Sequence, residues 1–234
     1  MTFRKILALA TLAGAALQAT AQVAPSLSLA EQMRGMLGKP ASAAPAAAPA
    51  FTPAPAVTNG GGMGAFNAPI VVDGPAQVRQ SAAELAQRFP AQHRAAMTKA
   101  YEESFVFWQK LEKQLGLAPN DVAAAVAAFI AGNYTAFMQQ PVPDEHFKSL
   151  VLQMQSLLAR NPGFLQSPAS AKRAMFEQLA MVGTFMVVYR EHLNRQPSPG
   201  EEVNFRNAAK ANLEAALGLN VERLQIGPQG LVVR

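Results

Sequence analysis

The chain has 234 residues, half of them hydrophobic, and it contains no cysteine, which excludes disulfides, zinc–thiolate sites and thiol catalysis. Its formal net charge of +5 includes Arg4 and Lys5 near the N-terminus, and the other basic residues are scattered among acidic ones. Nucleic acid is therefore not an expected partner, since binding to a phosphate backbone requires clustered positive charge.

Residues 1–21 have the organisation of a signal peptide. Arg4 and Lys5 precede an uncharged, Ala- and Leu-rich run that closes on Ala19-Thr20-Ala21, an Ala-x-Ala cleavage pattern. Polar and small residues interrupt this run before it could comfortably span a bilayer. We predict an exported protein, periplasmic or secreted, with no transmembrane segment after cleavage of the leader.

Residues 22–75 are predicted to form a flexible linker, because Ala, Pro and Gly dominate them and offer little apolar surface to bury. Ser28-Leu29-Ala30-Glu31 matches a capping box that would open a short amphipathic helix over residues 28–37. Such a helix is too short to be stable alone. It is either transient, docked on the following domain, or docked on a partner or a membrane surface.

Residues 76–234 are predicted to form one mainly α domain, a bundle of about five to six helices. Capping boxes at Ser81–Glu84 and Ser198–Glu201, together with prolines suited to first turns, place helix starts near residues 81, 90, 119, 143, 168 and 199. Gly116 and Gly218 have the sequence context of helix C-caps. The helix that starts near Pro119 is predicted to end or kink at Gly132-Asn133-Tyr134.

The C-terminal segment has a different pattern. Two short apolar runs, Leu224–Ile226 and Leu231–Val233, flank Gly227-Pro228-Gln229-Gly230 and predict a β-hairpin. A hairpin of this size is marginal alone, so it should pack on the helices or pair with a third strand formed by Ile70–Val72.

Several motifs carry a resemblance to a known family. They are Asn120-Asp121-Val122-Ala123, Phe129-x-x-Gly132-Asn133-Tyr134, Gln153-Met154, the segment from Phe176 to Gly183, and Leu217-Gly218 with Gly230-Leu231. Together they resemble an uncharacterised family of secreted bacterial proteins, a domain of unknown function, over roughly Val78 to Leu231. The resemblance implies a mostly helical exported domain and brings no activity, cofactor or catalytic residue with it.

The common catalytic and metal-binding patterns are missing. His93, His146 and His192 fall on three different predicted helices, and neither His-Glu-x-x-His nor Gly-x-Ser-x-Gly occurs. We therefore expect no metal site and no cofactor.

Glu177 is the candidate for a catalytic carboxylate. It falls between Phe176 and Leu179 in an apolar helix, an environment that would suit a general acid in a cell-wall-active hydrolase. The other interpretation is an ion pair with Lys172 or Arg173. Enzymatic activity is thus left open, although the sequence favours a protein without it.

Four polar residues at the two ends of the Pro119–Met138 stretch are candidates for ligand or partner binding. Asn120, Asp121, Asn133 and Tyr134 are explained either as helix caps and a packed tyrosine, or as corners of a ligand groove shared with Glu177. The sequence thus predicts an exported, noncatalytic module that binds or scaffolds an unknown envelope or extracellular protein, with the hydrolase as the alternative. It does not identify the partner or the oligomeric state.

Overall fold

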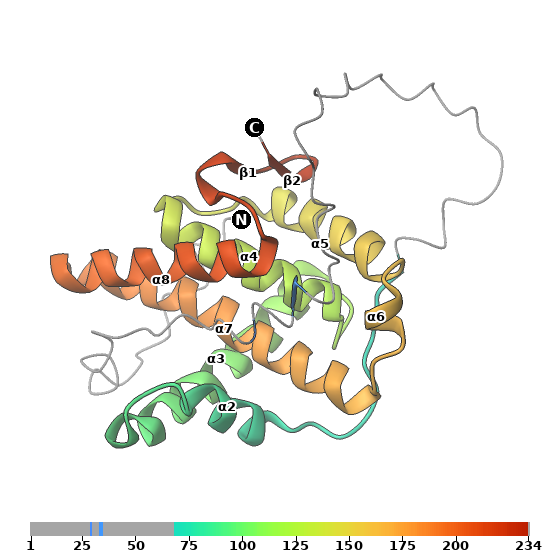
Figure 1. The fold of residues 1–234 in the computed structure, drawn as a ribbon, viewed down its shortest axis with the longest axis horizontal. Helices are drawn as coiled ribbons and strands as arrows, with labels where there is room; N and C mark the ends of the chain where they lie inside the picture. The colour runs from blue at the N-terminus through green and yellow to red at the C-terminus, as the bar shows by residue number, and fades with distance from the viewer. Residues whose placement is uncertain (1–28, 30–32, 35–67, 234) are drawn as a thin grey trace.

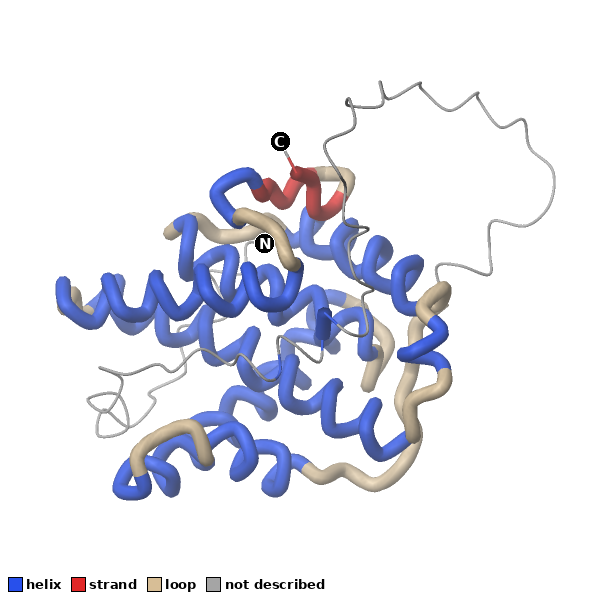
Figure 2. The backbone as a smooth tube through the Cα atoms, in the orientation of Figure 1, coloured by secondary structure: helices blue, strands red, loops and turns tan. Residues whose placement is uncertain are grey.

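The structure is a computed structural model that describes residues 29, 33–34 and 68–233 (Figure 1). Helices make up most of the described backbone, and one short hairpin lies at the C-terminal end (Figure 2). The prediction of a mainly α fold with a C-terminal hairpin is confirmed. In chain order the elements are α2 (Val78–Ala86), α3 (Ala91–Leu115), α4 (Val122–Met138), α5 (Asp144–Leu158), α6 (Pro162–Leu165), α7 (Ala169–Arg195), α8 (Pro199–Leu217), the 3-10 helix η4 (Val221–Arg223), β1 (Leu224–Gly227) and β2 (Gly230–Val233).

Helices α4 and α7 form the centre of the bundle and pack against each other. Fifteen of the 17 residues of α4 are buried, so this Ala-rich helix is enclosed on all sides. The other helices surround the pair: α3 packs on α7, α5 and α8 pack on α4, and α2 bridges α3 and α7. A helix that is apolar around its whole circumference has to be covered in this way.

Two of the predicted helix starts are wrong. Helix α2 begins at Val78, so Ser81 lies inside the helix, and its hydroxyl donates to Glu177 instead of capping. Helix α4 begins at Val122, not at Pro119, and Asp121 is its N-cap through a 3.0 Å bond from the Ala123 N–H. The cap satisfies an amide that the first turn leaves without a partner.

A helix end at Gly132-Asn133-Tyr134, one of the two predicted alternatives, is also wrong. Helix α4 runs through these residues to Met138 and ends with Gln139 in the left-handed conformation, at φ 57°. The C-caps at Gly116 and Gly218 are confirmed, with φ of 68° and 67°. Glycine adopts this conformation without a steric penalty.

The hairpin packs on α5, as predicted, but it has no third strand. The sheet contains β1 and β2 alone among the described residues, paired from Leu224 with Val233 to Gly227 with Gly230. The side-chain amide of Gln153 on α5 holds β2 by donating to the Leu231 carbonyl at 3.0 Å and accepting from the Leu231 N–H at 2.8 Å.

The segment 70–72 pairs elsewhere. The Val72 N–H donates to the Asn120 carbonyl at 3.1 Å, and the Val122 N–H donates to the Ile70 carbonyl at 3.0 Å. This segment therefore fastens to the α3–α4 corner and not to the hairpin, because that corner offers free backbone groups where α4 begins. The packed body accordingly includes residues that precede the predicted boundary at 76.

Three residues from the predicted amphipathic helix also contact the bundle. Leu29 and Met33 are each 1% exposed and belong to the hydrophobic core. The Arg34 guanidinium donates to the Glu214 carbonyl in the last turn of α8 at 2.9 Å, where a cation is favoured by the helix dipole. Of the alternatives for residues 28–37, these positions favour docking on the domain itself. The predicted leader, residues 1–21, and the rest of the predicted linker up to residue 67 lie outside the described residues.

Candidate functional site

The two central helices cross at a pair of glycines. A Cβ atom built on Gly132 would lie 2.1 Å from the carbonyl oxygen of Gly183. One built on Gly183 would lie 2.4 Å from the carbonyl group of Ala128. Neither position has space for a side chain, so α4 and α7 are in backbone contact here.

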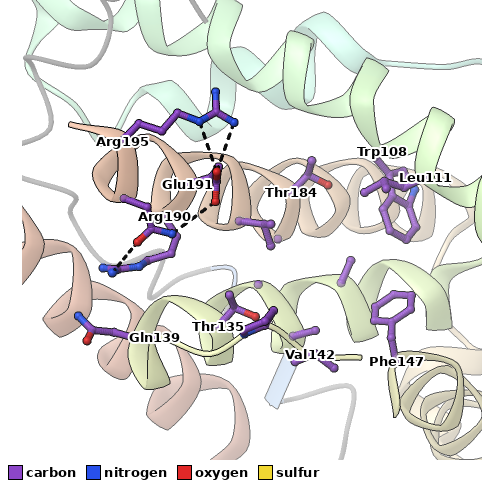
Figure 3. Close-up of a pocket in the computed structure, with 17 residues that line it drawn as sticks. Trp108, Leu111, Thr135, Gln139, Val142, Phe147, Thr184, Arg190, Glu191 and Arg195 are labelled. Carbon is purple, nitrogen blue, oxygen red and sulfur yellow. Dashed lines mark hydrogen bonds and ion pairs between the residues drawn. The ribbon is translucent and has the colours of Figure 1, made fainter. Parts of the chain in front are cut away.

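A cavity opens beside this crossing, because the side chains around it are small. It has a volume of about 340 Å³ and lies between α4 and α7, with further walls from α3 and from the connection between α4 and α5 (Figure 3). Ala131 and Thr135 line it from α4, and Thr184 and Val187 from α7. This volume is within the range of small-molecule sites.

The two ends of the cavity differ in chemistry. Trp108, Leu111 and Phe147 form one end, and each is 1% exposed. Gln139, Arg190, Glu191 and Arg195 form the other, which Figure 3 shows well separated from the aromatic end. The cavity therefore offers an apolar interior and a polar, charged mouth.

The charged groups at the mouth are held by partners. Arg190 pairs with Glu202 from the first turn of α8 and donates to Asn194 at 2.8 Å. Arg195 pairs with Glu191 at 3.3 Å while remaining half exposed. Each guanidinium group at the mouth therefore has a carboxylate partner.

Thr184, which lines the cavity, has a buried hydroxyl group. Its residue is 3% exposed, and its hydroxyl has no hydrogen-bond partner among the described residues. A buried hydroxyl without a partner costs on the order of 1–3 kcal/mol. The oxygen itself is buried, so a ligand in the cavity would reach it only after the side chain had rotated.

None of the five polar residues singled out in the sequence lines this cavity. Glu177 is fully buried, and its carboxylate accepts from the Gln77 N–H at 2.9 Å, the Ser81 hydroxyl at 2.7 Å and the Arg173 Nε at 2.8 Å. The ion pair with Arg173 that the sequence allowed is present. Glu177 thus ties α2 to α7.

Asn120 and Asp121 belong to the same buried network. Arg173 donates from Nη1 to the Asn120 side-chain oxygen at 3.0 Å. Asp121 accepts from the Ile70 N–H at 3.0 Å and from the Gln155 amide at 2.8 Å, in addition to capping α4. The network therefore fastens the segment 70–72, α4, α5 and α7 together, and its donors and acceptors are directed inward.

Glu112, at the end of α3, lies beside this network. Burial raises the pKa of its carboxyl to about 7, against the opposing effects of the Trp108 indole N–H and the Asn120 backbone N–H. Its Oε1 atom has no hydrogen-bond partner among the described residues. At neutral pH this carboxyl therefore exists as a mixture of its charged and neutral forms.

Asn133 and Tyr134 lie apart from that network. Asn133 is fully buried, donates to the Phe129 carbonyl at 2.8 Å and accepts from the Asn212 amide at 2.9 Å, which links α4 to α8. Tyr134 is 9% exposed in the core of the bundle. The structure brings together Asn120, Asp121 and Glu177, and it does not bring these two residues to them.

Comparison with known protein families gives one result. Residues 5–234 match DUF6683, a family of unknown function. The chain belongs to DUF6683. This match extends beyond the stretch from Val78 to Leu231 that carries the resemblance. Comparisons of this DUF6683 member with curated proteins and with solved structures find no match.

The residues that line the cavity in this DUF6683 member were missed in the sequence. Part of the signal was present, because Gly183-Thr184 interrupts a run of large apolar residues in α7 and Gly132 interrupts α4. Small residues inside two long apolar helices indicate a close helix crossing. Which faces flank the crossing, and whether the space beside it is filled, depends on the packing.

Two kinds of site find no support in the described residues. Among them, no three histidine or acidic side chains gather in a way that could hold a metal ion. No helix in the described part of the chain has both the length and the apolar character that a membrane span requires.

Proposed function

We propose that the protein is an exported, noncatalytic binding module that takes up a small envelope or extracellular molecule in the cavity between α4 and α7. The observation that carries this proposal is the cavity itself, with its apolar end and its charged mouth. Concave, mostly apolar sites with a few fixed polar groups are typical of small-molecule binding. The sequence of residues 1–21 supports export.

The proposal is tested by filling the cavity. Val187 lines the cavity from α7, and Val187→Phe should place an aromatic ring in the space that a ligand would occupy. Val203, 59% exposed on α8, offers the matched control Val203→Phe. The three proteins would be purified from the envelope fraction of a bacterial host and the co-purifying small molecules measured by mass spectrometry.

We expect the unaltered protein and Val203→Phe to carry the same small molecule, and Val187→Phe to lose it. The same molecule on all three proteins would refute binding in this cavity. Intact mass of the exported protein tests the leader at the same time, because cleavage after Ala21 should leave Gln22 as the first residue.

The alternative of a wall-active hydrolase with Glu177 as general acid stays a prediction. A general acid has to come within hydrogen-bond reach of the substrate. Glu177 is fully buried, lies away from the cavity, and already accepts three hydrogen bonds. These contacts support a structural role. Wall hydrolysis by the unaltered protein that disappears in a folded Glu177→Gln variant would reverse this interpretation.

A further inference from the structure

We propose that the ligand is a small, uncharged and mostly apolar molecule, a proposal that rests on the cavity being the binding site. Three features of the cavity lead to this conclusion. They are the balance of charge at the mouth, the apolar character of most of the lining, and the volume.

The charged groups at the mouth balance one another. Among the described residues, the charged ones that line the cavity are Arg190, Glu191 and Arg195. Arg190 pairs with Glu202, and Arg195 pairs with Glu191 at 3.3 Å. The formal charges of these two ion pairs sum to zero. Because each positive group lies beside a negative one, the mouth attracts neither anions nor cations strongly.

A charged ligand would lose more than it gains here. An anion would compete with the carboxylates that already hold the two guanidinium groups, and a cation would compete with Arg195 for Glu191. Deeper in the cavity the lining residues are uncharged. A charge that is buried without a partner loses its hydration and gains no compensating interaction. An uncharged ligand avoids both losses.

Most of the lining favours an apolar molecule. Ten of the 17 residues that line the cavity are glycines or have apolar or aromatic side chains. They come from several elements, with Trp108 and Leu111 on α3, Val142 between α4 and α5, and Val187 on α7. Contact with an apolar ligand removes this surface from water, which is favourable in proportion to the area.

The volume sets the size of the ligand. An engineered apolar cavity of about 150 Å³ in another protein holds one benzene molecule. The cavity between α4 and α7, at about 340 Å³, has roughly twice that volume. It therefore admits a molecule with the bulk of about two such rings, or a single hydrocarbon chain of similar bulk.

A built-in probe makes this testable. Trp108 is the only tryptophan in the chain and lines the cavity, so intrinsic fluorescence reports on occupancy beside it. The purified protein would be titrated at neutral pH with octanol, octanoate and octylammonium, which share one chain length and differ in the charge of the head group. Isothermal titration calorimetry would measure the same three affinities without relying on the tryptophan. All concentrations would stay below the onset of micelle formation.

We expect octanol to bind about tenfold or more tightly than either ion, because a charge entering this site gives up water without gaining a partner. Equal or tighter binding of octanoate or octylammonium would overturn the uncharged ligand and leave the cavity as a binding site. No binding of any probe by either method would overturn both.

Filling the cavity verifies where the probe binds. Val187→Phe should abolish octanol binding, whereas Val203→Phe, at an exposed position of α8, should leave it unchanged. Circular dichroism would verify that both variants are folded. Octanol binding that persists in a folded Val187→Phe protein would place the probe elsewhere and overturn both proposals.

The balance of charge at the mouth has its own test. Glu191→Gln removes the carboxylate that pairs with Arg195 and makes the mouth net positive, so octanoate should bind severalfold more tightly while octanol binding stays unchanged. Glu103→Gln, which removes the acid of an exposed ion pair with Lys99 on α3 outside the lining, is the matched control and should change neither. Octanoate binding that does not improve in Glu191→Gln would overturn charge balance as the reason for the selectivity.

Discussion

Replacement of Gly132 by alanine tests the closest contact in the bundle. In an ordinary helix interior this change is stabilising by about 1 kcal/mol, because alanine has the higher helix propensity. Here the new Cβ would lie 2.1 Å from the Gly183 carbonyl oxygen, and the obstacle is backbone, which cannot rotate away. Helices α4 and α7 would have to separate by about 1 Å, and the packing on both sides of the crossing would loosen.

The expected magnitude follows from these opposing terms. Overpacking of a core costs typically 1–3 kcal/mol and more when no side chain can give way. Because the crossing involves the two central helices and the obstacle is backbone, we take a value at or above the top of this range, about 3–4 kcal/mol, and subtract the gain in propensity. Gly132→Ala should therefore lower the free energy of unfolding by roughly 2–3 kcal/mol.

Urea unfolding followed by circular dichroism would measure this difference. Gly200, in the first turn of α8, is the matched control, because a Cβ there has no atom within 4 Å, and Gly200→Ala should be neutral or slightly stabilising. A Gly132→Ala protein as stable as the unaltered one would show that the helices do not cross in backbone contact. The explanation of the cavity would then fail as well.

Three further predictions concern the buried network and the N-terminal contact. Burial raises the pKa of Glu112 from 4.5 to about 7, so the folded protein retains a proton that the unfolded chain releases. The free energy of unfolding should thus fall as the pH rises from about 4.5 through 7. The expected fall is about 1–2 kcal/mol, since some contact of the carboxyl with solvent remains. Urea titrations across that pH range should show the decline, and Glu112→Gln should remove it. Glu177→Gln leaves the buried Arg173 without its counter-ion and should destabilise the protein by about 3–5 kcal/mol. Replacing both Glu177 and Arg173 by apolar residues of similar size should recover most of this loss. Equal stability of the single and the double variant in thermal unfolding would contradict a buried ion pair. Leu29→Ala should cost about 2–5 kcal/mol if the docked position is occupied, and no change in the denaturation midpoint would show that this segment does not contribute to the core.

The sequence alone determined most of the helices and the hairpin, because their signals are local. Prolines at the predicted starts near residues 90, 143, 168 and 199 and glycines at two of the ends place these boundaries within one or two residues of those observed. Gly116 shows why, since a left-handed C-cap depends on the conformational freedom of one residue. Such features need no knowledge of the rest of the fold.

Local signals misled where a residue had a distant partner. Ser81 has the spacing of a capping box, yet its hydroxyl bonds to Glu177, 96 residues along the chain. Gly132 and Asn133 have the composition of a helix end, yet α4 continues through them. Gly132 has no side chain and so lets the backbone of α7 approach, and Asn133 accepts a hydrogen bond from Asn212. Burial outweighed local preference in each case, because an unsatisfied buried polar group costs more than a lost cap.

The tertiary structure decided what the candidate site is. The sequence identified Asp121 and Glu177 as unusual polar residues, and the structure places both in a network with their hydrogen-bonding groups turned inward. The cavity instead opens beside a helix crossing made by alanines, glycines and Thr184, residues that attract no attention in a sequence. A cavity is space that side chains fail to fill, and only the approach of α4 to α7 determines where that space lies.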